Sequence, residues 1–372
     1  MNRILKRLFL LVLCFTIVFS GCGDTENKER EQAQIRQRNM RSIVDIYTEY
    51  PDSKSSATYN SFGSGIILEK NQNGDVYVAT NLHVVSGGLK EDGEYEEGCS
   101  TIVSFNGGGK ENGVSASLIG FYKNFDIAVL FVKDFAKKFS IVCPIEKTIV
   151  KPIATERIRV FGNALGKGLS VTEGVVSVDS EYLSMSVSYQ QTPITLRQIR
   201  VDAPMNQGCS GGGVFNLNGE FIGMVNARSG KDGVDDFGYV IPSATVIPLC
   251  QKIIDGYNQN DLQTEIFDLG VNVTETNPVF TWIDKEDRIE TSYSVVVSSV
   301  KVGTIGSVFL QNGDVIDSVT LNDKEFSFTR EFDLDNISYL VKIGDNLTFK
   351  YKRSGVSMEY SFAVDQAYMV NN

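Results

Sequence analysis

Residues 208–212 read Gly-Cys-Ser-Gly-Gly, so that glycines lie on both sides of Ser210. A serine hydroxyl is a weak nucleophile at neutral pH. It needs an adjacent base and N–H donors for the oxyanion of a tetrahedral intermediate. Glycine lets backbone amides turn inward because it has no Cβ that would clash. The stretch indicates a nucleophile at Ser210 and an oxyanion hole from the amides of Gly208 and Ser210, with Cys209 as a third candidate. A glycine-rich hairpin turn is the alternative.

The only histidine of the chain, His83, is the candidate base. It lies in the stretch Asn-Leu-His-Val-Val, directly after an apolar segment typical of a strand. A lone histidine is more often a surface or core residue. Its combination with a nucleophilic serine is what favours catalysis.

A carboxylate between these two residues would complete the site. Asp126 opens the apolar segment Asp-Ile-Ala-Val-Leu-Phe-Val. An aspartate at the mouth of a buried strand is well placed to hold an imidazole in one tautomer. A solvated turn is the alternative for Asp126. Asp202, eight residues before Ser210, is the competing acid, and its position favours a structural place beside the substrate pocket.

The order of the three residues discriminates between folds. Gly-x-Ser-x-Gly also surrounds the nucleophile of α/β-hydrolases, where the histidine follows the serine. No histidine follows Ser210 in this chain. The order His83, Asp126, Ser210 is that of the chymotrypsin-type template.

The hydrophobic pattern also favours β structure. Short apolar or alternating segments recur between turns rich in Gly, Asn and Asp, which is typical of sandwiches and barrels. The expected strands include residues 63–68, 76–80, 101–105, 127–132, 157–162, 171–178 and 221–225. One amphipathic helix is predicted from Ser243 to Gly256, with apolar residues at helical spacing.

Residues 61–255 resemble the protease domain of the HtrA/Deg family of chymotrypsin-fold serine proteases. The resemblance lies in seven blocks in the family's order, namely 63–67, 79–85, 126–130, 162–163 with 171–177, 208–212, 218–226 and 237–243. It implies a mainly β fold with a chymotrypsin-like double β-barrel. It also implies an endopeptidase for misfolded proteins that needs no cofactor or metal, and members of the family are typically trimers.

The resemblance departs from the family near the serine. Cys209 stands where the family has Asn, Gly213 and Gln207 stand where it has Pro, and no catalytic atom is lost. The two glycines follow Ser210 and not Cys209, so the register favours serine as the nucleophile. These departures motivate a second hypothesis, a peptide-binding chaperone or scaffold with weak or no proteolysis. A secreted esterase is a third and weaker one.

The primary substrate pocket is expected beside the serine. By position it should be lined by Pro204, Met205, Met224, Val225 and Asn226. No acid lies at its base in this alignment, so the resemblance implies small or medium aliphatic side chains before the cleaved bond.

Residues 265–366 more faintly resemble a bacterial PDZ domain, after a linker at 258–264 and before a tail at 367–372. Leu269, Gly270 and Val271 match its carboxylate-binding loop. The resemblance implies that C-terminal hydrophobic peptides bind there by strand addition. A PDZ-shaped spacer without a ligand is the alternative. Residues 277–292 are interpreted as a polar insertion that contains the only Trp, Trp282.

The N-terminus is expected to direct the chain out of the cytoplasm. A basic start and an uncharged run ending at Phe19 predict a signal peptide over 1–21. Ser-Gly-Cys at 20–22 resembles a lipobox, which implies lipidation of Cys22 and anchoring to the cell membrane; cleavage without a lipid is the alternative. Residues 22–41 are predicted to be a solvated tether, with a short helix as the alternative. The protease domain is expected over 42–257, and the segment before Ser64 is a candidate for trimer contacts.

The net charge and the spacing of the cysteines argue against some classes of ligand. The net charge of -11 disfavours nucleic acid. The chain has no Cys-x-x-Cys spacing, so a structural zinc site is not expected. A disulfide between Cys99 and Cys143 is conceivable but does not follow from spacing. Cys250 is expected to be a buried thiol.

Overall fold

The computed structural model describes residues 27–51, 58–90, 94–133, 142–228, 237–261, 264–284 and 288–371. The chain divides into two compact units, Met1–Val246 and Ile247–Asn372. The division falls inside helix α3 (Ser243–Gln259), whereas the linker was expected at 258–264. The expected signal segment and Cys22 lie outside the described residues.

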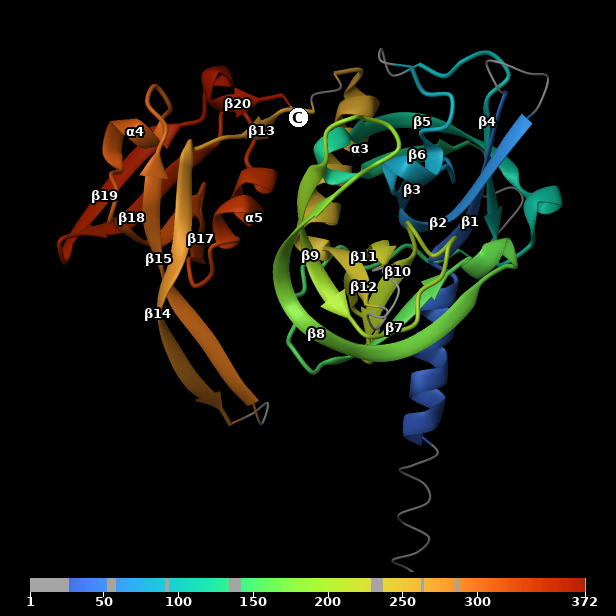
Figure 1. Cartoon of the computed structure of the whole chain (residues 1–372), viewed down its shortest axis with the longest axis horizontal. Coiled ribbons are helices and arrows are strands. Elements are labelled where there is room, and N and C mark those ends of the chain that lie inside the picture. The colour runs from blue at the N-terminus through green and yellow to red at the C-terminus, as the bar shows by residue number, and fades with distance from the viewer. Residues whose placement is uncertain are drawn as a thin grey trace, which may run out of the picture. The chain divides into compact units, whose positions relative to one another are not determined.

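The first unit contains two closed six-stranded barrels, both antiparallel (Figure 1). The first barrel has the order β1-β2-β3-β6-β5-β4. Its strands are β1 (Ile43–Pro51), β2 (Thr58–Lys70), β3 (Val76–Thr80), β4 (Ser100–Phe105), β5 (Val114–Tyr122) and β6 (Ile127–Val132). The second barrel has the order β10-β11-β12-β9-β8-β7. Its strands are β7 (Arg157–Gly162), β8 (Ser170–Met185), β9 (Ile194–Val201), β10 (Gly213–Asn216), β11 (Phe221–Arg228) and β12 (Gly238–Pro242). The double barrel expected from the sequence is confirmed.

Each barrel closes around its own apolar core, because strand residues alternate between the inside and the outside. The first core is built from side chains such as Val44, Val78 and Leu130. The second core includes Val160, Ile199 and Val240. Because apolar side chains fill the inside of each closed barrel, polar side chains from the two barrels can meet only at the ends of the strands.

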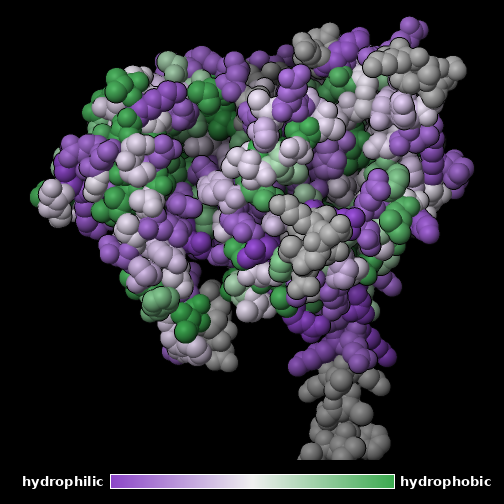
Figure 2. All heavy atoms as spheres, in the orientation of Figure 1, coloured by the Kyte–Doolittle hydropathy of each residue, from purple (hydrophilic) through white to green (hydrophobic). Residues whose placement is uncertain are grey.

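Residues 27–40 form a helix, which is the alternative that the sequence left open for the tether. The helix is attached to the second barrel. Gln32 Nε2 donates to Leu217 O at 3.1 Å, and Arg159 Nη2 donates to Gln32 Oε1 at 3.0 Å. Figure 2 shows hydrophilic side chains over the part of this helix that faces the viewer. In the described part of the chain, no helix is long and apolar enough to span a membrane.

The second unit is a sheet of antiparallel strands in the order β14-β15-β16-β18-β19, with β17 paired to β16 and a separate pair β13-β20. The unit also contains two helices, α4 (Gly306–Phe309) and α5 (Asp333–Leu340). The strands are β13 (Ile266–Phe267), β14 (Val271–Ile283), β15 (Arg288–Val300), β16 (Val315–Leu321), β17 (Lys324–Ser327), β18 (Asn346–Arg353), β19 (Val356–Ala363) and β20 (Met369–Val370). Strand pairing continues through the described part of residues 277–292, so the segment expected as a polar insertion belongs to the hairpin of β14 and β15.

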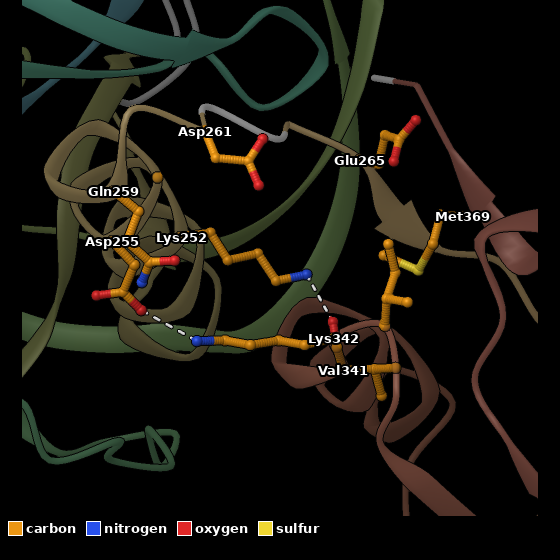
Figure 3. A pocket seen from close by; sticks show the side chains of 10 residues that line it. Lys252, Asp255, Gln259, Asp261, Glu265, Val341, Lys342 and Met369 are labelled. Atoms are coloured by element: carbon orange, nitrogen blue, oxygen red, sulfur yellow. Dashed lines mark hydrogen bonds and ion pairs between the residues drawn. The ribbon is translucent and has the colours of Figure 1, made fainter.

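The second unit also holds a cavity of about 400 Å³ that is lined largely by charged side chains (Figure 3). Lys252 Nζ donates to Val341 O at 2.8 Å, and Lys342 Nζ pairs with Asp255 Oδ2 at 3.0 Å. Burial, with a smaller contribution from the positive charge of Lys342, lowers the pKa of Lys252 to about 8. Cys250, on the same helix, is a buried thiol as predicted, and neither Cys99 nor Cys143 is in a disulfide.

Candidate active site

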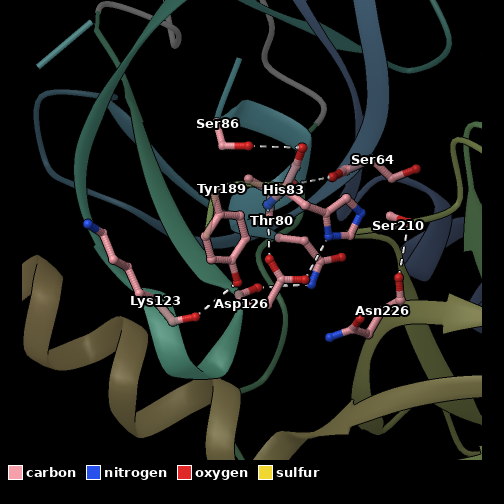
Figure 4. A network of polar contacts seen from close by, with 10 residues as sticks. Ser64, Thr80, His83, Ser86, Lys123, Asp126, Tyr189, Ser210 and Asn226 are labelled. Carbon is pink, nitrogen blue, oxygen red and sulfur yellow. Dashed lines mark hydrogen bonds and ion pairs between the residues drawn. The ribbon is translucent and has the colours of Figure 1, made fainter. Parts of the chain in front are cut away.

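His83 and Asp126 come from elements that the first barrel brings to one end. His83 lies in the short helix α2 (Leu82–Val85), which directly follows β3. Asp126 precedes β6, the neighbour of β3, and Thr80 pairs with Ala128 in that register. His83 Nδ1 lies 2.7 Å from Asp126 Oδ2, and His83 N donates to Asp126 Oδ1 at 2.9 Å (Figure 4). Both carboxylate oxygens thus face one residue, and Asp126 is fully buried.

This contact fixes the chemistry of the imidazole. A carboxylate accepts hydrogen bonds, so this contact favours the tautomer with the proton on Nδ1 and a lone pair on Nε2. Asp126 is held in a left-handed backbone conformation with φ 51° at the end of the 3-10 turn η2 (Lys123–Phe125). Asn81 Nδ2 and Leu82 N donate to its backbone carbonyl at 3.0 and 3.2 Å. The strained conformation is stabilised by these donors, and the carboxylate is aimed at His83.

Ser210 lies where the second barrel meets the first. Its carbonyl accepts a hydrogen bond from Ser64 N of β2 at 2.8 Å. Its hydroxyl donates to Asn226 O of β11 at 3.1 Å. Figure 4 shows the hydroxyl on the imidazole side of His83, away from Asp126. Catalytic hydrogen bonds are often formed only when substrate is present, so the bond to Asn226 leaves Ser210 a candidate nucleophile.

The turn around Ser210 requires glycine. Gly208 and Gly211 have φ of 94° and 82°, where other residues are strained. A Cβ at Gly208 would meet the carbonyl of Asn163, and one at Gly211 would meet the carbonyl of Ser64. Ser64 Oγ donates to Gly208 O at 2.7 Å, which orients that peptide.

Cys209 does not fit the role of a third oxyanion donor. Its amide donates to Asn206 O at 3.0 Å within the turn, so it is already used. The amides of Gly208 and Ser210 remain as candidates. Burial also raises the pKa of the Cys209 thiol, which keeps it protonated and unreactive. This supports Ser210 over Cys209 as the nucleophile.

A cavity of about 310 Å³ opens beside Ser210. Of the expected residues, Met205, Val225 and Asn226 line it; Asn206, Gln207, Ser210, Ala227 and Arg228 complete the lining. None of these eight residues is acidic. Pro204 and Met224 are not part of the lining, and Met224 is fully buried elsewhere in the barrel.

The sequence placed Asn226 in the pocket but did not indicate how its side-chain amide is bonded. It is 1% exposed, and neither of its amide atoms has a hydrogen-bond partner in the described part of the chain. An unsatisfied buried amide is costly and favours a ligand or water that can pair with it. The competing acid Asp202 has another partner, since its Oδ1 accepts from Val175 N at 2.6 Å.

Tyr189 is a residue near the site that sequence reasoning missed. It lies between β8 and β9 and packs against the core of the first barrel. Its hydroxyl donates to Lys123 O at 2.9 Å, in the turn that presents Asp126 (Figure 4). Burial raises the pKa of Tyr189 strongly, and the negative charge of Asp126 adds to the effect. No local sequence pattern marks such a residue.

The expected carboxylate-binding loop of the second unit is partly occupied from within. Gly270 N donates to Asp268 Oδ1 at 2.8 Å, and Leu269 is buried. A carboxylate of the chain itself thus uses one of the amides expected for a ligand. In the described residues, no cluster of side chains could hold a metal ion.

The comparisons with known proteins agree with this fold. A trypsin-like peptidase domain family matches residues 63–224. Serine protease Do-like HtrA of Lactococcus lactis subsp. cremoris is 28% identical over 338 residues, which are 88% of this chain and 76% of that protein. Serine protease Do-like HtrA of Bacillus subtilis is 29% identical over 342 residues, which are 89% of this chain and 70% of that protein.

A further curated relative and a solved structure are also similar to this chain. Periplasmic serine endoprotease DegP of Escherichia coli is 27% identical over 317 residues, covering 83% of this chain and 58% of that protein. Among solved structures, the HtrA-type protease AlgW with decapeptide has the same fold, with a TM-score of 0.53, 20% identity, and coverage of 89% of this chain and 97% of that one. Fold and matches together define a trypsin-like serine endopeptidase. Within that class, the chain is a homologue of the HtrA/DegP serine proteases.

Proposed function

We propose that this protein cleaves misfolded or unfolded proteins outside the cytoplasm, with His83, Asp126 and Ser210 as a catalytic triad. The observation that carries the proposal is the double contact of His83 with the buried carboxylate of Asp126, beside the glycine-lined turn of Ser210. The endopeptidase class is given by the homologues. The assignment of each role to a residue is the proposal.

The proposed reaction proceeds through an acyl-enzyme. The Ser210 hydroxyl turns from Asn226 O to His83 Nε2 and attacks the substrate carbonyl, while its proton passes to Nε2. Asp126 stabilises the imidazolium, and the amides of Gly208 and Ser210 stabilise the oxyanion. Collapse breaks the C–N bond, and the amine leaves with the proton of His83. Water then attacks the ester with His83 as base, which releases the acid and restores Ser210.

The pocket supports a preference for small or medium aliphatic side chains before the cleaved bond. Its lining has no acid, and Arg228 would repel a basic side chain. Unfolded chains can present such residues in extended form, whereas a folded protein buries them. Cleavage profiling on an unfolded protein tests the preference, and dominant cutting after Lys or Arg would contradict it.

The localisation of the protein and its binding partners are also part of the proposal. The signal-like N-terminus and the DegP homologue, named a periplasmic protease, support export, with Cys22 as a proposed lipid anchor to the membrane. Assembly as a trimer is proposed from the family resemblance alone. The second unit is proposed to bind polypeptide, although a C-terminal carboxylate at 269–271 would have to displace Asp268 from Gly270.

A peptide-binding chaperone or scaffold with weak or no proteolysis is the second candidate, favoured by the hydroxyl of Ser210 donating to Asn226 O. Casein degradation and labelling by a fluorophosphonate separate the two. We expect Ser210→Ala to lower cleavage by at least about 1,000-fold, because only the activated hydroxyl forms the ester. Cys209→Ala should retain labelling and most activity. An active Ser210→Ala protein, or an unlabelled wild type, would refute the triad.

A further inference from the structure

A groove of about 880 Å³ is lined by the helix at residues 27–40 and by strand β7 of the second barrel. Of its eight lining residues, one is acidic, Glu29, and five are basic, namely Lys28, Arg30, Arg36, Arg157 and Arg159. The whole chain has a net charge of -11, so this concentration of positive charge is the opposite of its average surface. We call the surface formed by these residues the basic groove.

The helix side of the basic groove is attached to the barrel at its middle. Lys28, Gln32 and Arg36 are spaced four residues apart, so they lie on one face of the helix. Gln32 Nε2 donates to Leu217 O at 3.1 Å, and Gln32 Oε1 accepts from Arg159 Nη2 at 3.0 Å. Lys28 and Arg36 therefore flank this contact, one on each side along the helix.

The barrel side of the basic groove contains a buried charge. Arg159 is 5% exposed, and its Nη1 has no hydrogen-bond partner in the described part of the chain. Its Nε donates to Glu173 Oε1 at 2.7 Å. Because burial keeps water from screening the guanidinium, Arg159 adds a positive potential that a fully solvated cation would not supply.

The positive charge of the groove is only partly compensated. Arg157 Nη2 and Arg159 Nε both pair with Glu173, at 3.0 and 2.7 Å. Lys28, Arg30 and Arg36 form no ion pair with a described residue. Five basic residues face two acidic ones, Glu29 and Glu173, which leaves a surplus of three positive charges. Like charges held this close repel one another, so an anion in the groove would be stabilised.

The residue types in the groove favour phosphate among the anions. Four of the five cations are arginines, whose planar guanidinium presents paired N–H donors to two phosphate oxygens. A phosphate has enough oxygens to contact the helix and the strand together, whereas a carboxylate has two oxygens on one side. The acidic surface of the whole chain disfavours a long polyanion such as a nucleic acid. A single phosphate group is the ligand that fits.

We propose that the basic groove binds a phosphate group, with Lys28 and Arg36 contacting it from the helix and Arg157 from strand β7. Arg159 lies behind them as a fixed positive charge. The phosphate can be free or part of an anionic lipid head group. Cys22, the proposed lipid site, precedes Lys28 by six residues, which span at most about 20 Å when extended. A lipid anchor at Cys22 would keep the groove near head groups.

Two measurements on the full chain with Ser210→Ala distinguish the sources of the phosphate. Isothermal titration calorimetry with inorganic phosphate at pH 7 measures the free group. Flotation with phosphatidylcholine vesicles, with and without phosphatidylglycerol, measures the anionic head group, and the apolar N-terminus contributes equally to both vesicle types. We expect saturable phosphate binding at one site per chain. We also expect binding to vesicles with phosphatidylglycerol to be at least about fivefold stronger.

Variants locate the contact. Lys28→Gln and Arg36→Gln are each expected to raise the Kd at least about fivefold, the contribution of one cation at an anionic surface. Both leave the contact of Gln32 with Arg159 in place. Lys70→Gln is the matched control, because it removes the same charge at an exposed lysine of β2. It should leave the Kd within about twofold, since Lys70 does not line the groove.

The two sources give different results. Phosphate binding without a preference for phosphatidylglycerol would identify the free group as the ligand, and the preference without measurable phosphate binding would identify the head group. Absence of both, equal weakening by Lys70→Gln, or acetate or a polyglutamate peptide binding as tightly as phosphate would overturn the inference. The groove shares no residue with the cavity beside Ser210, so casein degradation by the wild type tests the proposed proteolysis separately.

Discussion

Tyr189 contacts the turn that presents Asp126 and does not line the cavity beside Ser210. Lys123 O accepts from its hydroxyl at 2.9 Å and from Asp126 N at 3.4 Å. The hydrogen bond of the phenol thus stabilises the turn in which Asp126 has a left-handed backbone conformation. A small shift of this turn would misalign the carboxylate that we propose stabilises the imidazolium of His83. Tyr189 is a positioning residue on this reasoning.

Tyr189→Phe is expected to lower kcat/KM about three- to tenfold, which corresponds to the loss of one neutral hydrogen bond. Weaker support from Asp126 destabilises the protonated imidazole, so the acidic limb of the kcat/KM profile should move to lower pH. Peptide hydrolysis measured between pH 5 and 9 checks both effects. Tyr59→Phe, at a half-exposed tyrosine, is the control. An unchanged profile with a lower Tm would show that Tyr189 is only structural.

Among the secondary-structure elements, strand β1 is unusual because it contains a buried carboxyl group. Asp45 is 1% exposed, and its Oδ2 has no hydrogen-bond partner in the described residues. Its neighbours across the strands are Ser64 and Ser104. Burial raises the pKa of Asp45 to about 6 from 3.8. The folded protein therefore binds this proton more tightly than the unfolded chain does.

The sign of the pH effect follows from that shift. Below about pH 4 the carboxyl is protonated in both states and costs nothing. As the pH rises from about 4 to 6, the unfolded chain loses this proton while the folded protein still holds it, and the unfolding free energy falls, by about 3 kcal/mol at most. Asp45→Asn should flatten the dependence between pH 4 and 6. Hydrogen exchange of the β1 amides at these pH values measures it, with exposed Glu111→Gln as control. A slope equal to that of the wild type would contradict the assignment.

The elements that sequence reasoning predicted well are those whose pattern is local. The segments 76–80, 127–132 and 157–162 coincide with β3, β6 and β7, because uninterrupted apolar runs between turns leave little choice of boundary. Strand β1 was not predicted, since Asp45 interrupts its apolar pattern. The sequence pattern predicts only a polar insertion at 277–292, because the strand pairing there depends on cross-strand contacts that composition does not reveal.

The candidate catalytic residues could be selected from the sequence more readily than their surroundings could be predicted. His83, Asp126 and Ser210 lie in short motifs whose order restricts the fold, and His83 and Asp126 are in direct contact. The role of Tyr189 depends on a contact across 66 residues of sequence, and the internal occupation of Gly270 by Asp268 depends on one loop conformation. Neither is visible as a motif, because both are consequences of the packed structure.

The two barrels of the first unit make the site together, and Ser64 is where they are joined. Its hydroxyl donates to Gly208 O and accepts from Asn163 N, both at 2.7 Å. Its backbone amide donates to Ser210 O at 2.8 Å, and its carbonyl accepts from Thr80 Oγ1 at 2.7 Å. One fully buried residue of the first barrel thus orients the turn of the second barrel that holds the candidate nucleophile. We therefore expect the folding of both barrels to be coupled to the formation of the turn at residues 208–212, which we call the oxyanion turn.

Ser64→Ala tests that coupling. It leaves Gly208 O and Asn163 N buried without this partner, and each such group costs about 1–3 kcal/mol. We expect the unfolding free energy of the first unit to fall by about 2 kcal/mol or more in urea, followed by circular dichroism. We also expect kcat to fall more than KM rises, because the oxyanion turn loses its anchor while the pocket of Met205 and Val225 stays in place. Ser115→Ala, at an exposed serine of β5, should change neither quantity. A Ser64→Ala protein that is less stable but has the kcat of the wild type would show that the barrels are joined at Ser64 without setting the oxyanion turn.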